Sequence, residues 1–401
     1  MKKQKKKNWT LPRHKVITAL LRYPLSLYCR LVYGLRLPRK NERIRQQSLI
    51  LLNHQTPFDQ FFVGMYCAKP VYYMATEDIF SNGWVSKLIK WLVAPIPIKK
   101  QTTDIQAVKN CIKVAKEGGT IAIAPEGNRT YNGKTLYMSP AIASLAKKLN
   151  LPVALFRIEG GYGVQPRWSD VVRKGSMRAY VSRVIEPEEY AQLSNEELYQ
   201  QIKEGLDVNE ASVSGSFVHQ KSAEYLERAM YVCPDCGLST FESHDDVIQC
   251  KTCGRQIRYL PTKELQGVGK PFPFRFVADW YDYQCDFVNG LDTRKLCGVP
   301  LYREQIRLSE VVVYKRKNVL RRNAELALYG DRMTVDDELV FPFGEVSAVT
   351  VLGKNKLNVY HGKTVYQIKG DKRFNALKYV NLFYRWKNIT GGNENGKFLG
   401  I

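Results

Sequence analysis

Residues 48–59 read SLILLNHQTPFD, and this run predicts a buried strand that turns into a helix. The apolar residues end at Asn53, and Thr56-Pro57 is a typical helix start. His54 and Asp59 lie around this turn, five positions apart. A neutral imidazole accepts a proton from a hydroxyl, and a carboxylate on its other nitrogen fixes the tautomer and stabilises the imidazolium. The run therefore predicts a base and its orienting acid at a strand end.

The same residues also fit a helix cap, which is an alternative without chemistry. Residues 56–59 have the pattern of a capping box with proline in the first turn. In that interpretation, Asp59 only accepts backbone N–H groups and His54 only occupies a loop. A second polar turn bears on this choice.

This second turn follows the apolar run 120–124 and reads PEGNRT at residues 125–130. Gly127 lets a substrate approach the backbone, and Arg129 can hold a phosphate with paired donors in a fixed fork. Glu126 can bond a hydroxyl of an acceptor or brace Arg129. The alternative is an ordinary turn with a surface salt bridge.

Predicted strands alternate with predicted helices around both turns. The strands are expected at 48–52, 71–74, 94–100, 120–124 and 152–158, and the helices at 58–66, 82–93, 104–118, 140–149 and 194–208. This alternation is typical of an α/β sheet with helices on its faces. Sites in such sheets lie at strand ends, where both polar turns fall.

Together the two turns resemble the glycerophospholipid acyltransferase family, whose best-known members are 1-acylglycerol-3-phosphate acyltransferases. The first block of that family, Asn-His, four residues and then Asp, is present at residues 53–59. The third block, usually Phe-Pro-Glu-Gly-Thr-Arg-Ser, matches residues 124–130 with Pro, Glu, Gly and Arg kept.

The other two blocks are weaker. The fourth, a proline-containing apolar strand, fits residues 151–154. The second, usually Gly-x-x-Phe-Ile-x-Arg, matches residues 94–100 only at Ile98, and Lys100 stands where arginine is usual. The order and separation of the blocks agree, and the resemblance covers about residues 15–210.

The resemblance implies an O-acyltransferase of phospholipid biosynthesis that uses no catalytic metal. His54 would deprotonate a glycerol hydroxyl, and Asp59 would orient His54. The alkoxide would attack the thioester of acyl-CoA or acyl carrier protein, with backbone amides or a cation at the oxyanion.

The implied acceptor is a lysophospholipid, foremost 1-acylglycerol 3-phosphate. Lys100 and Arg129 would hold its phosphate, with Glu126 and Gly127 in the same substrate site. A lysine is a point charge rather than a bidentate fork, so the acceptor preference can differ from that of the family.

The net charge of +23 is concentrated at the start of the chain. Residues 1–45 hold seven Lys and seven Arg against Glu42 alone, a net charge of +13. Such a block favours a polyanion, either anionic lipid or nucleic acid. Apolar residues between 15 and 36 favour lipid, although two arginines and a proline leave no run of the ~18–20 uncharged residues that a transmembrane helix needs.

We therefore expect a retained, basic amphipathic segment on an anionic membrane surface, at the cytoplasmic face of the cell membrane and peripheral or monotopic. A solvated basic tail is the alternative. The predicted helix 82–93, with Trp84 and Trp91, suits either the same interface or the core.

Four of the nine cysteines form two C-x-x-C pairs separated by 13 residues: Cys233, Cys236, Cys250 and Cys253. This spacing predicts a zinc ribbon, in which four thiolates close the coordination shell and the zinc is structural. A rubredoxin-like iron site and a pair of redox disulfides are the alternatives. The other cysteines are scattered, which indicates a reducing compartment.

The ribbon lies outside the acyltransferase pattern, and we expect it to pack on that domain or bind a protein partner. Nucleic acid is not an expected partner, because Asp245 and Asp246 lie between the cysteine pairs where a basic cluster would be needed.

From Ile306 the pattern changes to short strands separated by turns. The seven predicted strands and one closing helix lie at 311–315, 324–329, 332–335, 338–342, 346–352, 356–360, 364–368 and 373–386. This order resembles the pleckstrin-homology-like fold at the level of architecture. Lys354 and Lys356 share one turn that is either solvated or able to meet a phosphate.

The predicted chain is an α/β acyltransferase-type sheet flanked by helices, followed by a zinc ribbon and a small β-rich domain. Its parts are a membrane-binding segment (1–45), the acyltransferase domain (46–225), the ribbon (226–262), an aromatic-rich linker (263–305), the pleckstrin-homology-like domain (306–390) and a tail (391–401). A helix at 223–231 is expected to lead into the first cysteine pair.

Two other functions fit parts of the sequence. One is an acyltransferase for a different lipid acceptor. The other is a non-catalytic membrane scaffold that only binds lipid, with the ribbon and the C-terminal domain as recruiting surfaces.

Overall fold

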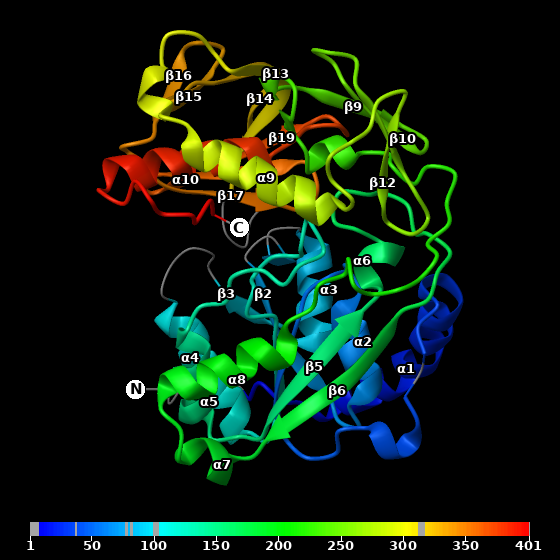
Figure 1. Cartoon of the computed structure of the whole chain (residues 1–401). Coiled ribbons are helices and arrows are strands. Elements are labelled where there is room, and N and C mark those ends of the chain that lie inside the picture. The colour runs from blue at the N-terminus through cyan, green and yellow to red at the C-terminus, as the bar shows by residue number, and fades with distance from the viewer. Residues whose placement is uncertain are drawn as a thin grey trace, which may run out of the picture. The chain divides into compact units, whose positions relative to one another are not determined.

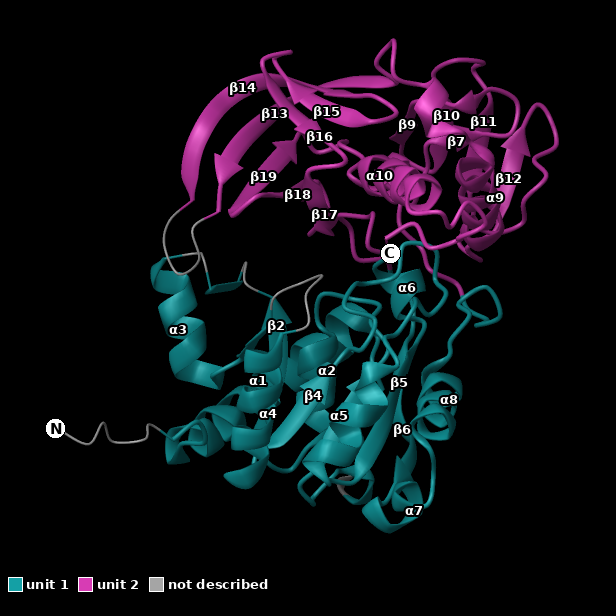
Figure 2. Ribbon diagram, turned by 90° about the vertical axis from the view of Figure 1, so that its left-hand side faces the viewer, with its two compact units in different colours: residues 1–166, 174–215 teal, residues 167–173, 216–401 magenta. Residues whose placement is uncertain are grey.

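The structure of the chain is a computed structural model with two compact units (Figure 2). Unit 1 comprises residues 1–166 and 174–215, and unit 2 comprises residues 167–173 and 216–401. The residues described are 8–36, 38–76, 79–80, 83–98, 104–311 and 317–400.

Unit 1 is built on one six-stranded sheet with the order β3-β2-β4-β1-β5-β6 (Figure 1). Its strands are β1 (Leu49–Leu52), β2 (Val71–Thr76), β3 (Ile96–Ile98), β4 (Thr120–Ile123), β5 (Val153–Glu159) and β6 (Arg178–Ile185). The first five are parallel, and β6 is antiparallel to β5. All residues of β1 are buried, as expected for a strand covered on both faces. The α/β class predicted from the sequence is confirmed.

Helices cover both faces of this sheet. One face packs against α4 (Ile105–Lys116), α5 (Ala141–Leu149) and α8 (Asn195–Leu206), which share a core with β1, β4 and β5. The other face packs against α2 (Asp59–Tyr66), where the Tyr66 ring meets the Phe156 ring of β5 at 5.1 Å. The long helix α1 (Pro12–Tyr33) contacts α2 and α3 (Trp84–Val93). Two short helices, α6 (Gly161–Val164) and α7 (Pro187–Ala191), complete the unit.

None of the described helices combines the length and the apolar composition needed to cross a bilayer.

The first part of unit 2 is a ribbon around the cysteine pairs. A short hairpin, β7 (Val232–Cys233) and β8 (Gly237–Leu238), precedes the antiparallel sheet of β9 (Phe241–His244), β10 (Val247–Cys250), β11 (Gln256–Tyr259) and β12 (Leu265–Val268). Helix α9 (Val277–Gly290) forms within the segment that we expected to be a linker.

The prediction of a helix at 223–231 is wrong, because only a single 3-10 turn forms there, at Leu226–Arg228. Tyr225 has a positive φ of 71°, which an α-helix cannot contain. Neighbouring backbone amides bond to other segments instead: Ala223 N donates to Asp245 O at 2.7 Å, and Tyr231 N donates to Gln284 Oε1 at 2.7 Å.

The second part of unit 2 is a seven-stranded antiparallel sheet with the order β16-β15-β14-β13-β19-β18-β17, followed by α10 (Leu377–Thr390). The strands are β13 (Tyr302–Glu310), β14 (Asn318–Leu328), β15 (Arg332–Val335), β16 (Leu339–Pro342), β17 (Val346–Leu352), β18 (Lys356–His361) and β19 (Thr364–Gly370). Four strands and three strands form two meanders, which β13 and β19 join. Residues 312–315 of the strand predicted at 311–315 lie outside the described residues.

Residues 167–173 belong to unit 2, although the chain on either side belongs to unit 1. Asp170 receives two bonds from Arg228, at 2.7 and 3.2 Å, and one from Lys354 Nζ at 2.8 Å. Burial raises the pKa of Asp170, but the bonds and charges of Arg228 and Lys354 outweigh it and lower this pKa to about 2. Lys354 therefore takes part in an ion pair within the protein rather than in a solvated turn.

Two aromatic rings hold the other end of this segment. The fully buried Arg173 guanidinium lies 4.8 Å from the ring centres of Trp168 and of Tyr259 in β11. Cation–π contacts of this kind strengthen when they are shielded from water. Residues 167–173 are thus integrated into the core of unit 2.

Candidate active site

The ends of three neighbouring parallel strands form the candidate site in unit 1. Strand β1 pairs with β4 on one side and with β5 on the other. Their carboxyl ends continue into the His54 turn, into residues 124–130 and into residues 160–163. The two polar turns predicted from the sequence therefore meet at one edge of the sheet, where sites of α/β proteins lie.

His54 and Asp59 are in direct contact. His54 Nδ1 lies 2.7 Å from Asp59 Oδ2. The Asp59 side chain is 1% exposed, whereas the His54 side chain is 25% exposed. A carboxylate on Nδ1 selects the tautomer with its proton there, so Nε2 is the nitrogen that can accept a proton from a substrate.

Asp59 is the first residue of α2 and also bonds the turn that precedes this helix. Its carboxylate accepts bonds from Gln55 N at 2.7 Å, from Thr56 N at 3.0 Å and from Thr56 Oγ1 at 2.6 Å. The capping box considered for residues 56–59 does not form, because the N-cap of α2 is Phe58 and no side chain caps it. The bonds of Asp59 instead hold the turn before the helix and fix the carboxylate against His54.

The turn after β4 holds the main chain of His54 on both sides. Thr130 N donates to His54 O at 3.1 Å, and His54 N donates to Glu126 Oε1 at 2.8 Å. The second oxygen of Glu126 accepts from Leu136 N at 2.7 Å. Glu126 thus braces backbone amides, which neither sequence interpretation of this residue included.

Burial raises the pKa of Glu126 to about 8, even though the two N–H donors favour its ionised form. The nearby charge of Asp59 raises this pKa further. Glu126 is therefore a buried carboxyl that titrates close to neutral pH.

Gly127 and Arg129 lie in the same turn. Gly127 is exposed and has a φ of 67°, and a Cβ there would have no neighbour within 4 Å. The glycine thus suits the backbone conformation, and its closeness to a substrate stays a prediction. Arg129 is half-buried, and its charge lowers the pKa of Tyr33, which burial and Asp59 raise. The charges of Arg129 and Asp59 therefore both influence the Tyr33 hydroxyl. Lys100 lies outside the described residues.

Sequence reasoning missed several residues that join these turns. Asn53 Nδ2 donates to Ile158 O at 2.8 Å, and Ile158 N donates to Asn53 Oδ1 at 2.7 Å, which ties the end of β1 to β5. Gln55 and Glu210 are both buried and bonded to each other at 3.0 Å. No local pattern marks Glu210, because its partner is 155 positions away in the sequence.

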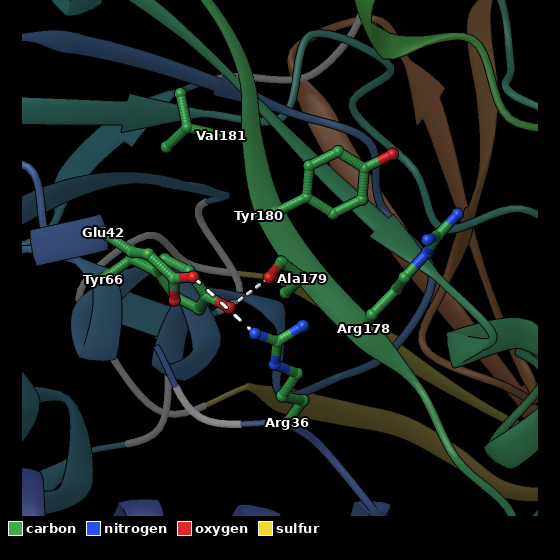
Figure 3. A pocket seen from close by; sticks show the side chains of 7 residues that line it. All are labelled: Arg36, Glu42, Tyr66, Arg178, Ala179, Tyr180 and Val181. Atoms are coloured by element: carbon green, nitrogen blue, oxygen red, sulfur yellow. Dashed lines mark hydrogen bonds and ion pairs between the residues drawn. The ribbon is translucent and has the colours of Figure 1, made fainter. Parts of the chain in front are cut away.

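An open cavity of about 410 Å³ lies elsewhere in unit 1 (Figure 3). Its lining residues, Arg36, Glu42, Tyr66, Arg178, Ala179, Tyr180 and Val181, include no predicted site residue. Arg36 pairs with Glu42 at 3.8 Å, and Arg178 pairs with Glu159 at 2.5 Å. Because both arginines already face carboxylates, the cavity has little excess positive charge for an anion.

The four cysteines of the pairs come together in unit 2. Their sulfur atoms all lie within 4.8 Å of one another. Cys233 Sγ lies 3.8 Å from Cys253 Sγ, close to the ~3.8 Å edge of a tetrahedron with metal–sulfur bonds of ~2.3 Å. The cluster can therefore bind a metal ion.

Parts of this chain are similar in sequence to known proteins. A sequence model of the family described as Acyltransferase matches residues 36–158. A 1-acyl-sn-glycerol-3-phosphate acyltransferase of Bacillus subtilis (strain 168) is 25% identical over 138 residues, 34% of this chain and 65% of that protein. The chloroplastic 1-acyl-sn-glycerol-3-phosphate acyltransferase LPAT1 of Arabidopsis thaliana is 22% identical over 167 residues, 40% of this chain and 45% of that protein.

The chain thus spans less than two thirds of each of these relatives. The crystal structure of PlsC, a 1-acyl-sn-glycerophosphate acyltransferase from Thermotoga maritima, matches with a TM-score of 0.42 and 19% identity, over 50% of this chain and 79% of that one.

The matched residues 36–158 include both polar turns and define an acyltransferase domain. These matches support the predicted resemblance of this domain to the glycerophospholipid acyltransferases.

The raised pKa of Glu126 predicts a pH-dependent stability. The carboxyl binds its proton more tightly in the folded protein than in the unfolded chain, whose ordinary value is 4.5. Its contribution to the free energy of unfolding therefore falls as pH rises from about 4.5 to about 8, by at most ~1.4 kcal/mol per pH unit.

Glu126→Gln removes the titrating carboxyl. The free energy of unfolding, measured with urea, should therefore fall less between pH 5 and pH 8 in the variant than in the wild type. Every other group titrates in both proteins, which makes the wild type the control. Parallel pH profiles would contradict the prediction.

Proposed function

We propose that the protein is a membrane-associated O-acyltransferase of phospholipid biosynthesis. It transfers a fatty acyl group from acyl-CoA or acyl carrier protein to a lysophospholipid, foremost 1-acylglycerol 3-phosphate. The observation that carries this proposal is the His54–Asp59 pair at 2.7 Å, fixed by a turn that contains Arg129. Both relatives are named as 1-acyl-sn-glycerol-3-phosphate acyltransferases, which agrees with the proposed acceptor.

In this mechanism His54 Nε2 takes the proton of a glycerol hydroxyl, and Asp59 stabilises the imidazolium. The alkoxide attacks the thioester carbonyl to give a tetrahedral intermediate. When this intermediate collapses, the carbon–sulfur bond breaks, and the thiolate that leaves takes the proton from His54. The ester and the free thiol are the products.

The acceptor's phosphate is assigned to Arg129, whose planar fork suits paired bonds to phosphate oxygens. Lys100 is proposed as a second phosphate contact, and Gly127 as the place where the acceptor passes the backbone. Glu126 serves the substrate site through the His54 main chain, to which it is bonded.

An apolar stripe on α1 supports membrane association. Five side chains that recur every three or four residues are 58–78% exposed, on a helix that is otherwise rich in basic residues: Val16, Leu20, Tyr23, Leu27 and Leu31. Large apolar side chains on one exposed helix face are typical of an interfacial helix.

Helix α3, a neighbour of α1, also exposes large aromatic side chains. Trp84 is 71% exposed and Trp91 is 51% exposed, with Lys87 and Lys90 exposed beside them. Arg13 of α1 donates to Trp91 O at 3.1 Å, so the two helices are neighbours. We assign this joint surface of α1 and α3 to an anionic membrane at the cytoplasmic face, where tryptophan and lysine favour the headgroup region.

The four-cysteine cluster is proposed to hold a structural zinc ion. Cys233 and Cys250 end strands β7 and β10, and Cys236 and Cys253 lie in the turns that follow. Four thiolates would leave no open coordination position, so the ion would stabilise the ribbon and supply no chemistry to acyl transfer.

The C-terminal sheet is proposed to be pleckstrin-homology-like. Its four-strand and three-strand meanders followed by α10 support this assignment at the level of topology. We propose protein binding for this domain or for the ribbon.

The catalytic roles predict large losses of activity. Purified protein with vesicles, labelled acyl donor and a panel of lyso-lipids should yield acylated product. His54→Ala should lower kcat by at least ~10³-fold, because it removes the base. Asp59→Asn should lower it by at least ~10²-fold, because an amide can impose the wrong histidine tautomer.

Asp279→Asn is the matched control, since Asp279 also accepts a backbone N–H at a helix start, in unit 2. Activity that survives both site substitutions would refute the assigned roles. Product only with another acceptor would reassign the substrate, and vesicle binding without any turnover would favour the scaffold.

Membrane binding can be measured by flotation with vesicles that contain anionic lipid. Leu20→Ser, Leu27→Ser and Leu31→Ser combined should lower the partition coefficient at least tenfold, since each buried leucine contributes ~1.5–3 kcal/mol. High salt should weaken binding of the wild type. The control is Val299→Ser, which replaces a 74% exposed side chain of unit 2. Unchanged binding of the triple variant would exclude α1 as the contact.

Metal analysis tests the cluster. Protein purified without chelators should contain about one zinc per chain, because four thiolates bind one ion. Cys250→Ser should lose most of it, whereas Cys285→Ser, at a half-buried thiol of α9 outside the cluster, should retain it. Bound iron, or two disulfides in place of a metal, would overturn the zinc assignment.

A further inference from the structure

A buried carboxylate outside both polar turns connects the strand ends of unit 1. Glu210 follows α8 and is 1% exposed. Its Oε1 accepts from Gly160 N at 2.6 Å and from Gln55 Nε2 at 3.0 Å. One oxygen atom therefore joins the turn after β5 to the turn after β1.

The turn after β4 is linked to the same residue. Glu210 N donates to Gly133 O at 2.8 Å, and Gly133 N donates to Thr130 Oγ1 at 2.9 Å. Thr130 in turn donates its N–H to His54 O at 3.1 Å. All three strand-end turns of the site thus bond directly or through one residue to Glu210.

Gln55 links Glu210 to the His54–Asp59 pair. It is 2% exposed, its Oε1 accepts from Tyr162 N at 3.2 Å, and its own N–H donates to Asp59 Oδ2 at 2.7 Å. A Cβ on Gly161 would lie 2.7 Å from Gln55 Oε1, so the packing around this amide is tight. A shift of the Gln55 side chain would therefore be passed to Asp59.

We propose that Glu210 is a positioning residue for the acyl transfer, which holds Gln55 and Gly160 and thereby orients the His54–Asp59 pair toward the acceptor hydroxyl. This inference rests on the proposed function. A misplacement of about 1 Å can cost a factor of about 100 in rate, so a residue that touches no substrate can control kcat.

The first test compares two substitutions in the full chain. Glu210→Ala removes the acceptor oxygen and should lower kcat at least tenfold, with less than a twofold change in KM for 1-acylglycerol 3-phosphate. Glu210→Gln keeps a carbonyl oxygen for both donors and should remain within threefold of the wild type. Rescue by glutamine indicates that the residue holds its neighbours and does not transfer protons.

Glu197→Ala is the matched control. Glu197 accepts from Ser194 N at 2.7 Å at the other end of α8, so its loss weakens the same helix without reaching the site. Its kcat should match the wild type, even if its melting temperature falls as far as that of Glu210→Ala.

The second test separates positioning from general stability. Hydrogen exchange of the backbone amides in residues 53–60 and 158–164 should accelerate at least tenfold in Glu210→Ala and not in Glu197→Ala. The double variant with Gln55→Ala should be no slower than the slower single variant, because the two residues act in series. If Glu210→Ala does not fold, the same measurements are made on Gln55→Ala.

The outcomes distinguish this inference from the proposed function. If His54→Ala abolishes turnover while Glu210→Ala keeps the wild-type kcat, only the role of Glu210 is refuted. Equal losses in Glu210→Ala and Glu197→Ala also refute it. A wild type that is inactive with every donor and acceptor overturns both proposals.

Discussion

The main chain of His54 is bonded on both sides to the turn that follows β4. Its N–H donates to Glu126 and its C=O accepts from Thr130. Strands β1 and β4 are parallel neighbours, so their carboxyl ends lie side by side and these bonds can form. They place the imidazole at the strand edge before any substrate arrives. Because the donors and acceptors are main-chain or buried groups, this preorganisation needs little reordering during the reaction.

The same constraint explains why two separate sequence blocks act as one site. Asp59 accepts from the amides of the turn before α2 and contacts His54 with the same carboxylate. One side chain thus holds both the turn and the imidazole. The turn that leads into α2 therefore also sets the geometry of the pair.

Strands β1 to β5 were predictable because buried parallel strands are continuous apolar runs. Strand β6 was missed, since it lies at the sheet edge and alternates exposed charges such as Arg178 and Arg183 with few buried positions. The helix predicted at 223–231 failed because tertiary bonds to Ser243 and Gln284 replaced helical ones. Within the site, His54, Asp59 and Arg129 were visible as a pattern. Glu210 was not, since its contacts arise only when distant turns meet.

Residues 167–173 determine where the chain would have to be cut to separate the two units. The chain passes between the units at 166/167, at 173/174 and at 215/216, so a single cut after residue 215 does not separate them. A truncated acyltransferase would retain Trp168 and Arg173 without the ring of Tyr259 that covers them. Conversely, grafting the ribbon-bearing unit onto another enzyme would require an inserted loop as well as a C-terminal fusion. Moving unit 2 as a whole therefore takes residues 167–173 together with residues 216–401.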